Sequence, residues 1–241
     1  MNENKLFVPI SILVAGLIIA GAVFFTQDSR APGAPTDEET PVQVEVKPVT
    51  SDDHIIGDMN AEIVIVEYSD FECPFCANFH KTMDQIMTEY GPTGKVAWVY
   101  RHFPLDQIHK EARPAAEASE CVANLGGNDA FWNYSKLLFA NAPTSLSTDN
   151  LKSNAVSLGI DEAAFTSCVD EGKFRDRVED NYQSGMELAK NDRNFGTPYS
   201  VVITKKDGAQ ITIPGAQSYS VLKQLIDAVL AESAPADQAT N

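Results

Sequence analysis

Basic residues are scarce in this chain, and no run of them occurs. Its 241 residues contain 18 Lys and Arg against 34 Asp and Glu, which gives a formal net charge of −16. A protein that binds nucleic acid needs a concentrated basic face to neutralise phosphates, so this composition excludes nucleic acid as a partner. Because 44% of the residues are hydrophobic and 22% are charged, the composition is that of a globular protein rather than a disordered one.

Histidine and cysteine are also scarce, with four of each. A structural zinc site needs paired ligands at short spacing, but Cys121 and Cys168 lie far apart and have no Cys or His close by in the sequence. The histidines show no spacing typical of a metal site or a catalytic dyad, so we expect no metal. Only His80 follows a cysteine at helical spacing, and we interpret it as an exposed helix residue. The four histidines are His54, His80, His102 and His109.

Long apolar runs are confined to the N-terminus. Residues 6–25 carry no charge, and a helix of that length can cross about 30 Å of hydrocarbon. We interpret residues 1–25 as an uncleaved membrane anchor; the alternative is a signal peptide cut near Ala20-Gly21-Ala22. Lys5 precedes the run and acidic residues dominate after it, which favours a cytoplasmic N-terminus. The sequence therefore predicts a single-pass protein of the cell membrane, with the rest of the chain on the extracytoplasmic side.

Composition divides the exported part into three segments. Residues 26–50 are rich in Pro, Thr and acidic residues, which is typical of an extended, solvated linker. Residues 51–231 carry the periodic apolar patterns of a folded unit. Residues 232–241 lack large apolar side chains, and we expect them to be a flexible tail.

The folded unit has the pattern of an α/β domain. Ile and Val run without alternation through residues 62–68, which predicts a strand buried on both faces and suggests a parallel sheet. The element order is βαβ, a helical insertion at about 105–193, then ββα, and we find no internal repeat. The expected strands are 62–68, 95–101, 199–204 and 210–214. A first helix is expected to end near residue 90, and helices with breaks at Gly126-Gly127, Ala142-Pro143 and Gly159 are expected over about 109–191. A last helix is expected over 221–230, where it closes the domain.

Cys73-Pro74-Phe75-Cys76 lies between the first strand and its helix. Pro74 suits the first helical position, where a missing N–H costs nothing. Free N–H groups and the helix dipole then face the Cys73 sulfur and favour the thiolate, which is the form that attacks a disulfide. We expect Cys73 to be the nucleophile and Cys76 the resolving thiol. The alternative is a structural disulfide, but so small a loop gains little by chain entropy.

Cys121 and Cys168 lie in helical patterns of the insertion, away from helix N-termini. We interpret them as a structural disulfide, which would stabilise the fold by about 4 kcal/mol on the chain-entropy model. A second redox pair that tunes the first, or two free buried thiols, are the alternatives.

Together these motifs resemble the DsbA-like thiol–disulfide oxidoreductases of the thioredoxin superfamily. The resemblance rests on VEYSDFECPFC at 66–76, YRHFPL at 100–105 and Gly196-Thr197-Pro198 before a strand, and it spans about 55–231. It implies a thioredoxin-like fold with an inserted helical domain, and oxidation of client dithiols. It also implies a cis Pro198 facing Cys73, with Thr197, Pro198, Pro74 and Phe75 forming the client-binding site.

Two residues near the cysteines bear on the direction of disulfide exchange and on proton transfer. Glu67 lies in the buried strand, where a desolvated carboxyl has a raised pKa and can relay the proton of Cys76. The alternative is a glutamate at the strand end with its carboxylate in water. Phe75 stands where the best-known oxidising version of the motif has His, so the Cys73 thiolate should be less stable and the dithiol more reducing.

These observations predict an exported, membrane-tethered enzyme that donates the Cys73–Cys76 disulfide to folding proteins. The same pair could instead act as a reductase or isomerase, and a tethered peptide-binding module without chemistry is a third hypothesis. The redox-active disulfide is the only cofactor expected. Expected partners are reduced or unfolded client proteins and, by resemblance, a quinone-linked reoxidase of the DsbB or vitamin K epoxide reductase type. We expect a monomer.

Overall fold

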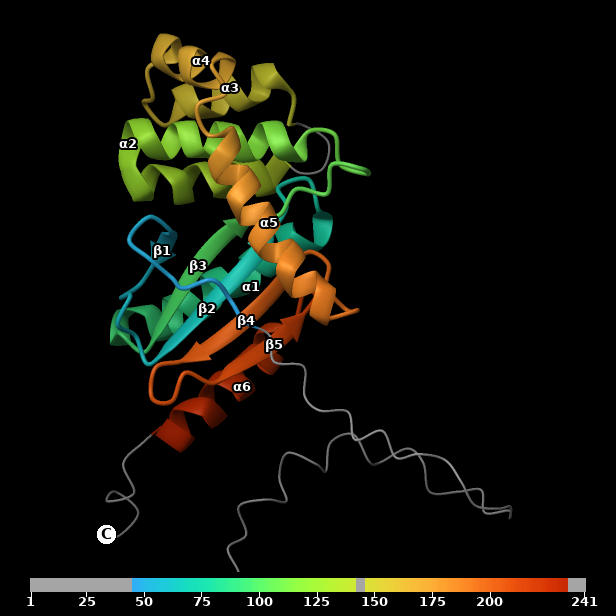
Figure 1. Ribbon diagram of the computed structural model, residues 1–241. Helices are drawn as coiled ribbons and strands as arrows, with labels where there is room; N and C mark the ends of the chain where they lie inside the picture. The colour runs from blue at the N-terminus through green and yellow to red at the C-terminus, as the bar shows by residue number, and fades with distance from the viewer. Residues whose placement is uncertain (1–44, 142–145, 234–241) are drawn as a thin grey trace, which may run out of the picture. The chain divides into compact units, whose positions relative to one another are not determined.

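The structure is a computed structural model that describes residues 45–141 and 146–233 of the chain. Within these residues the elements follow the predicted order, with one strand added at the start (Figure 1). They are β1 (His54–Ile56), β2 (Ile63–Ser69), α1 (Pro74–Tyr90), the short 3-10 helix η1 (Gly91–Thr93), β3 (Val96–His102), α2 (Ala112–Asn141), α3 (Thr148–Ser157), α4 (Glu162–Asp170), α5 (Arg175–Asn191), β4 (Tyr199–Thr204), β5 (Gln210–Pro214) and α6 (Tyr219–Ser233).

The strands of the described chain form a sheet in the order β1-β3-β2-β4-β5. β2 and β3 are parallel, as the βαβ pattern predicts. β1, β4 and β5 join antiparallel to their neighbours, so the sheet is mixed rather than parallel. β2 is central and buried on both faces, which explains its unbroken run of apolar residues.

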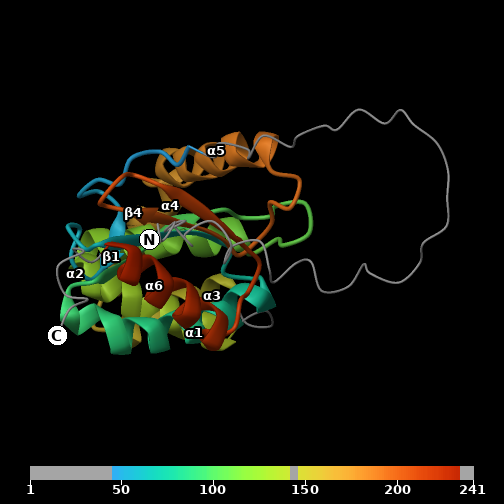
Figure 2. The same cartoon turned by 90° about the horizontal axis from the view of Figure 1, so that it is seen from below.

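Helices cover both faces of the sheet, as the view from below shows (Figure 2). α1 and α6 pack on the face that carries Ile65, Trp98 and Val202. α5 packs on the opposite face, which carries Val66 and Val201. α2, α3 and α4 gather at one end of the sheet (Figure 1), and α2 turns back on itself at Gly127, whose φ of 81° only glycine adopts readily. The thioredoxin-like α/β fold with a helical insertion is therefore confirmed.

The N-terminal part of the folded unit reaches further back than residue 51. Val46, within the predicted linker, is 4% exposed. Arg101 on β3 donates hydrogen bonds to the carbonyls of Lys47 at 2.8 Å and Pro48 at 3.1 Å. The last residues assigned to the linker thus pack against the sheet, because a buried guanidinium needs acceptors that this segment supplies.

No helix among the described residues combines the length and apolarity needed to cross a membrane. The predicted anchor at residues 1–25 lies outside the described residues, as do residues 26–44 of the linker, the break at Ala142-Pro143 and residues 234–241 of the tail.

Candidate active site

Cys73 stands where the chain leaves β2 and enters α1. It is the N-cap residue of α1, with an extended backbone of φ −77° and ψ 121°, and Pro74 follows at the start of the helix. The Cys73 N–H donates to the carbonyl of Asp70 at 3.1 Å, and the Cys73 carbonyl accepts from the N–H of Ala77 at 3.1 Å. Strand, turn and helix together fix the sulfur at the head of α1, as predicted from the sequence.

The surroundings of Cys73 favour its thiolate and lower its pKa to about 6. A hydrogen bond from the Cys76 thiol contributes most, and burial opposes it. Hydrogen bonds from Thr197 and from the backbone N–H groups of Cys76 and Phe75 lower the pKa further. The predicted contribution of the helix N-terminus is therefore present, but it is secondary to that of the neighbouring thiol.

Cys76 has the opposite environment. Its exposed fraction is 0%, whereas Cys73 keeps 4%. Burial, the hydrogen bond to Cys73 and the charges of Cys73 and Glu67 all raise the pKa of the Cys76 thiol. Neither of these cysteines is in a disulfide in the structure. The two environments thus differ: that of Cys73 favours the thiolate, and that of Cys76 favours the thiol.

Thr197 lies beside Cys73 although the two residues are far apart in the sequence. The Cys73 thiol donates to the Thr197 carbonyl at 3.4 Å, across 124 positions of the chain. The peptide between Thr197 and Pro198 is cis. Pro74 is exposed, and Phe75 is 65% exposed next to the sulfur. Thr197, Pro74 and Phe75 therefore border Cys73, and Pro198, which is buried, follows Thr197 through the cis peptide bond.

Glu67 lies on β2 beneath the cysteines and is fully buried. Trp98 Nε1 donates to Glu67 Oε2 at 2.9 Å. Burial raises the pKa of Glu67 to about 7, against the hydrogen bonds from Ser69 and Trp98, and the charge of Cys73 raises it further. The alternative of a strand-end glutamate in water is wrong, because β2 continues to Ser69 on a covered face. Its role as a proton carrier remains a prediction.

Asp70 shapes the turn before Cys73, a role that no motif in the sequence indicated. It is 1% exposed, and its carboxylate accepts from the N–H of Glu72 at 2.7 Å and of Leu105 at 2.8 Å. His109 Nδ1 lies 2.8 Å from the same carboxylate. An aspartate that bonds to the backbone two residues on is typical of such turns, but its contacts with the segment after β3 are long-range. Asp70 therefore positions the loop that carries Cys73.

A model of the thioredoxin family matches residues 49–228, which is most of the chain. The chain belongs to the thioredoxin family. Its fold is similar to that of several solved structures, each covering about three quarters of the chain. These are Wolbachia pipientis α-DsbA1 (TM-score 0.64, 23% identity, 77% of this chain and 94% of that one), Bacillus subtilis BdbD in its oxidised form (0.64, 23%, 78% and 98%) and Chlamydia trachomatis DsbA (0.65, 18%, 78% and 96%). The expected thioredoxin family is therefore confirmed, and the likeness to the DsbA structures is one of fold.

Curated relatives of this thioredoxin-family chain include proteins named as Na(+)/H(+) antiporters. Na(+)/H(+) antiporter NhaA 1 of Mycobacterium sp. strain KMS is 33% identical over 188 residues, which cover 76% of this chain but 29% of the antiporter. NhaA 3 of Salinispora tropica is 40% identical over 94 residues, or 39% of this chain and 14% of that protein. The chain therefore spans less than a third of the length of these relatives.

His80 is buried, and the prediction that it is an exposed helix residue is wrong. It is 3% exposed, and its ring lies 4.8 Å from those of both Trp98 and Phe139. Burial lowers its pKa to about 3, and the charge of Lys136 adds to this effect. The spacing of four residues from Cys76 places His80 on the same helix face, and that face is the buried one.

The insertion of this thioredoxin-family chain is closed by a disulfide between Cys121 on α2 and Cys168 on α4, as predicted. The two residues are 47 positions apart, and both are buried. Their sulfurs lie within the helical part of the fold rather than at a helix N-terminus. The bridge therefore links two helices of the insertion.

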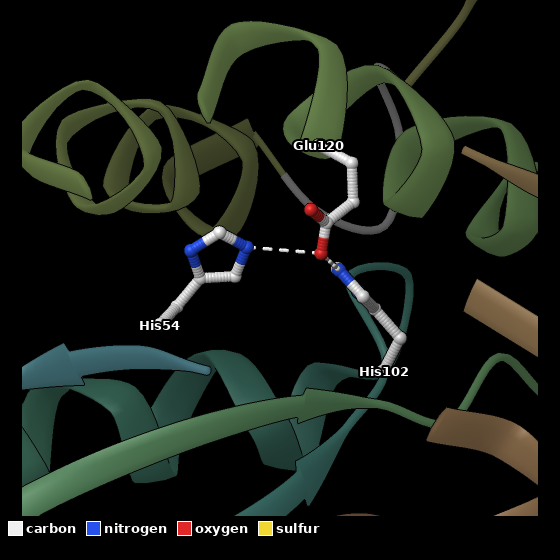
Figure 3. Close-up of side chains that lie close together, drawn as sticks. All are labelled: His54, His102 and Glu120. Atoms are coloured by element: carbon white, nitrogen blue, oxygen red, sulfur yellow. Dashed lines mark hydrogen bonds and ion pairs between the residues drawn. The ribbon is translucent and has the colours of Figure 1, made fainter. Parts of the chain in front are cut away.

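Two histidines and a glutamate meet between the sheet and α2 (Figure 3). Glu120 Oε1 lies 2.9 Å from His54 Nε2 and 3.0 Å from His102 Nε2. These atoms are close enough together to ligate a metal ion. Arg177 Nε, however, lies 2.6 Å from Glu120 Oε2 and already balances its charge. We interpret this set as an ion-pair cluster, which sequence spacing did not reveal because its members come from four different elements.

Proposed function

We propose that this chain is a membrane-tethered thiol–disulfide oxidoreductase on the extracytoplasmic side of the membrane, where it donates the Cys73–Cys76 disulfide to reduced client proteins. The observation that carries the proposal is the state of Cys73. Its sulfur stands at the N-terminus of α1 with a pKa lowered to about 6, next to the backbone of Thr197. A thiolate at neutral pH is the group that thiol–disulfide exchange requires.

The contrast between the two sulfurs supports the oxidising direction. A stabilised Cys73 thiolate favours the reduced dithiol, so the disulfide form readily accepts electrons from a client. In that direction a client thiolate attacks the Cys73 sulfur and breaks its bond to Cys76. Cys76, whose pKa is raised by burial, leaves and takes up a proton. A second client thiolate then attacks the mixed disulfide, forms the client disulfide and releases the Cys73 thiolate.

The surface around Cys73 fits an extended client segment. Phe75 offers an exposed apolar ring, and the Thr197 carbonyl offers a hydrogen-bond acceptor beside the sulfur. A peptide that lies along Thr197 would bring its cysteine to Cys73. The enzyme needs no cofactor besides its disulfide, acts as a monomer, and is reoxidised by a quinone-linked membrane protein of the DsbB or vitamin K epoxide reductase type.

The reduction potential of the Cys73–Cys76 pair tests the direction. The full-length chain is equilibrated with a glutathione redox buffer, and the oxidised fraction is followed. We expect a potential well above the value of about −270 mV that thioredoxin has. A potential near or below that value would reject the oxidase in favour of a reductase or isomerase.

A client-oxidation assay tests whether the chain catalyses disulfide exchange. Oxidised protein should form disulfides in a reduced, unfolded substrate, and Cys73→Ala should abolish this activity. A Cys121→Ala/Cys168→Ala variant is the control and should retain it. Full activity of Cys73→Ala would instead favour a tethered peptide-binding module.

A further inference from the structure

Cys76 faces a problem of proton transfer in the proposed reaction. Its thiol is 0% exposed, so bulk water cannot take its proton when it attacks a mixed disulfide at Cys73. Glu67 is the obvious acceptor, and Ser69, two positions further along β2, is a second buried polar side chain on the same strand.

The strands place Ser69 where such a group is needed. Ser69 follows Glu67 by two positions on β2, so both side chains lie on the same face of the sheet. That face also carries Tyr100, which lies opposite Glu67 on β3, and it is the face that α1 covers with Cys76. Ser69 is 1% exposed and Tyr100 is 1% exposed. Both hydroxyls are thus sealed in with the carboxyl.

The polar atoms of this pocket have unused hydrogen-bonding capacity. Glu67 Oε1, Ser69 Oγ and the Tyr100 hydroxyl have no well-aligned hydrogen-bond partner among the described residues. Buried polar atoms without partners are costly and rare in folded proteins, so a group of them beneath a reactive thiol calls for a functional reason. The Ser69 side chain acts to lower the pKa of Glu67, Cys76 and Tyr100 alike.

We propose that Ser69 relays the proton between Cys76 and Glu67, and that Tyr100 positions the Ser69 hydroxyl. The inference rests on the proposed function. As the Cys76 sulfur attacks the Cys73 sulfur of a mixed disulfide, its proton passes to Ser69 Oγ while the Ser69 proton passes to Glu67 Oε1. The bond between Cys73 and the client sulfur breaks, the bond between Cys73 and Cys76 forms, and the client leaves as a thiolate. Donation of the disulfide runs the same path in reverse.

A single-turnover reaction of the reduced full-length chain with an aromatic disulfide, dithiobis(nitrobenzoate), separates the two sulfurs. Attack by Cys73 releases the first thionitrobenzoate, and attack by Cys76 on the resulting mixed disulfide releases the second. We expect Ser69→Ala to slow the second release by about tenfold and Glu67→Gln by about 100-fold, within the range of general acid–base catalysis. The first release should change much less than the second in both variants, because it needs only the Cys73 thiolate.

A double-variant comparison identifies the relay. If Ser69 acts in series with Glu67, Ser69→Ala/Glu67→Gln should be no slower than Glu67→Gln alone. The pH profile of the second release should show an inflection near the Glu67 pKa of about 7, and Ser69→Ala should lose it. Losses that multiply in the double variant, or an unchanged rate and pH profile in Ser69→Ala, would reject the relay.

Ser200 supplies a matched control. It lies opposite Glu67 on β4, is 1% exposed, and its hydroxyl also has no well-aligned partner among the described residues. Ser200→Ala should leave the second release within twofold of the wild type, and Ser69→Thr should keep most of the rate because it retains a hydroxyl. An equal loss in Ser200→Ala would contradict a specific role for Ser69. If the unaltered chain fails to release the second product, the proposed function itself fails, and the relay is rejected with it.

Discussion

Phe75 occupies the middle of the Cys73–Cys76 loop, where its ring is 65% exposed. It adds no charge to the site, and among the described residues the main causes of the lowered pKa of Cys73 are hydrogen bonds from Cys76, Thr197 and backbone N–H groups rather than a basic side chain. The acidity of the thiolate therefore comes from dipoles and a neighbouring thiol. A charged residue at position 75 would add a separate contribution.

We predict that Phe75→His lowers the pKa of Cys73 and makes the pair more oxidising. A protonated imidazole near the sulfur stabilises the thiolate, and a shift of about one pKa unit is expected for a cation that water partly screens. Titration of the thiolate absorbance measures the shift, with Phe75→Leu as the uncharged control. An equal pKa in Phe75→His and Phe75→Leu would exclude the charge effect.

At the scale of elements, α2 and α4 are joined by the disulfide between Cys121 and Cys168. A bridge that closes a loop of this length restricts the unfolded chain far more than the Cys73–Cys76 bridge can. Its contribution is therefore to stability, whereas that of the Cys73–Cys76 pair is to chemistry.

Removing the structural disulfide with Cys121→Ala/Cys168→Ala should lower the free energy of unfolding by about 4 kcal/mol. Urea denaturation monitored by circular dichroism measures it. Cys73→Ala/Cys76→Ala is the matched control, and under oxidising conditions its loss should be clearly smaller because the loop that it opens is short. Equal losses for the two pairs would contradict the assignment of separate roles.

The elements that the sequence predicted well are those with strong local patterns. β2, β4, β5 and the start of α1 lie within one residue of the predicted bounds, because continuous apolar runs, turn residues and Pro74 are local signals. β1 has only three residues, too few for a periodic pattern, so it was missed. His80 was misplaced because a polar residue on a helix suggests water unless the neighbouring elements are known.

The residues of the candidate site also divide into those with a local signal in the sequence and those without one. The Cys73–Cys76 pair could be found because its residues are adjacent, and Thr197 and Pro198 were placed beside it only through family resemblance. Asp70 acts through contacts with the segment after β3, which no spacing in the chain reports. Burial decided the pKa of Glu67, and burial follows from packing.

At the scale of the whole molecule, the ion-pair cluster of His54, His102, Glu120 and Arg177 connects the sheet to the helices. His54 belongs to β1, His102 to β3, Glu120 to α2 and Arg177 to α5. Glu120 is 2% exposed, so its charge is buried and depends on these partners. The insertion and the sheet are thus held together partly by one carboxylate.

Glu120→Gln should destabilise the folded chain by about 3–5 kcal/mol at neutral pH, because it removes the buried negative charge that Arg177 faces and replaces one of the two acceptor oxygens by an NH2 donor. Burial opposes ionisation of Glu120, but the hydrogen bonds and charges of His102 and His54 hold its pKa well below the ordinary value of 4.5. The folded state therefore keeps this carboxylate ionised while the unfolded chain takes up a proton. Its contribution is fully present above pH 4.5 and is lost as the pH falls through the lowered value, so the difference between variant and wild type should shrink on acidification.

Glu117→Gln, three residues earlier on α2, is the control. Glu117 lies 3.6 Å from the largely exposed Arg175, and its loss should cost about 0–1 kcal/mol. Urea denaturation of the three proteins at neutral and acidic pH measures these differences, and a Glu120→Gln loss no larger than that of Glu117→Gln would show that the cluster does not hold the insertion in place.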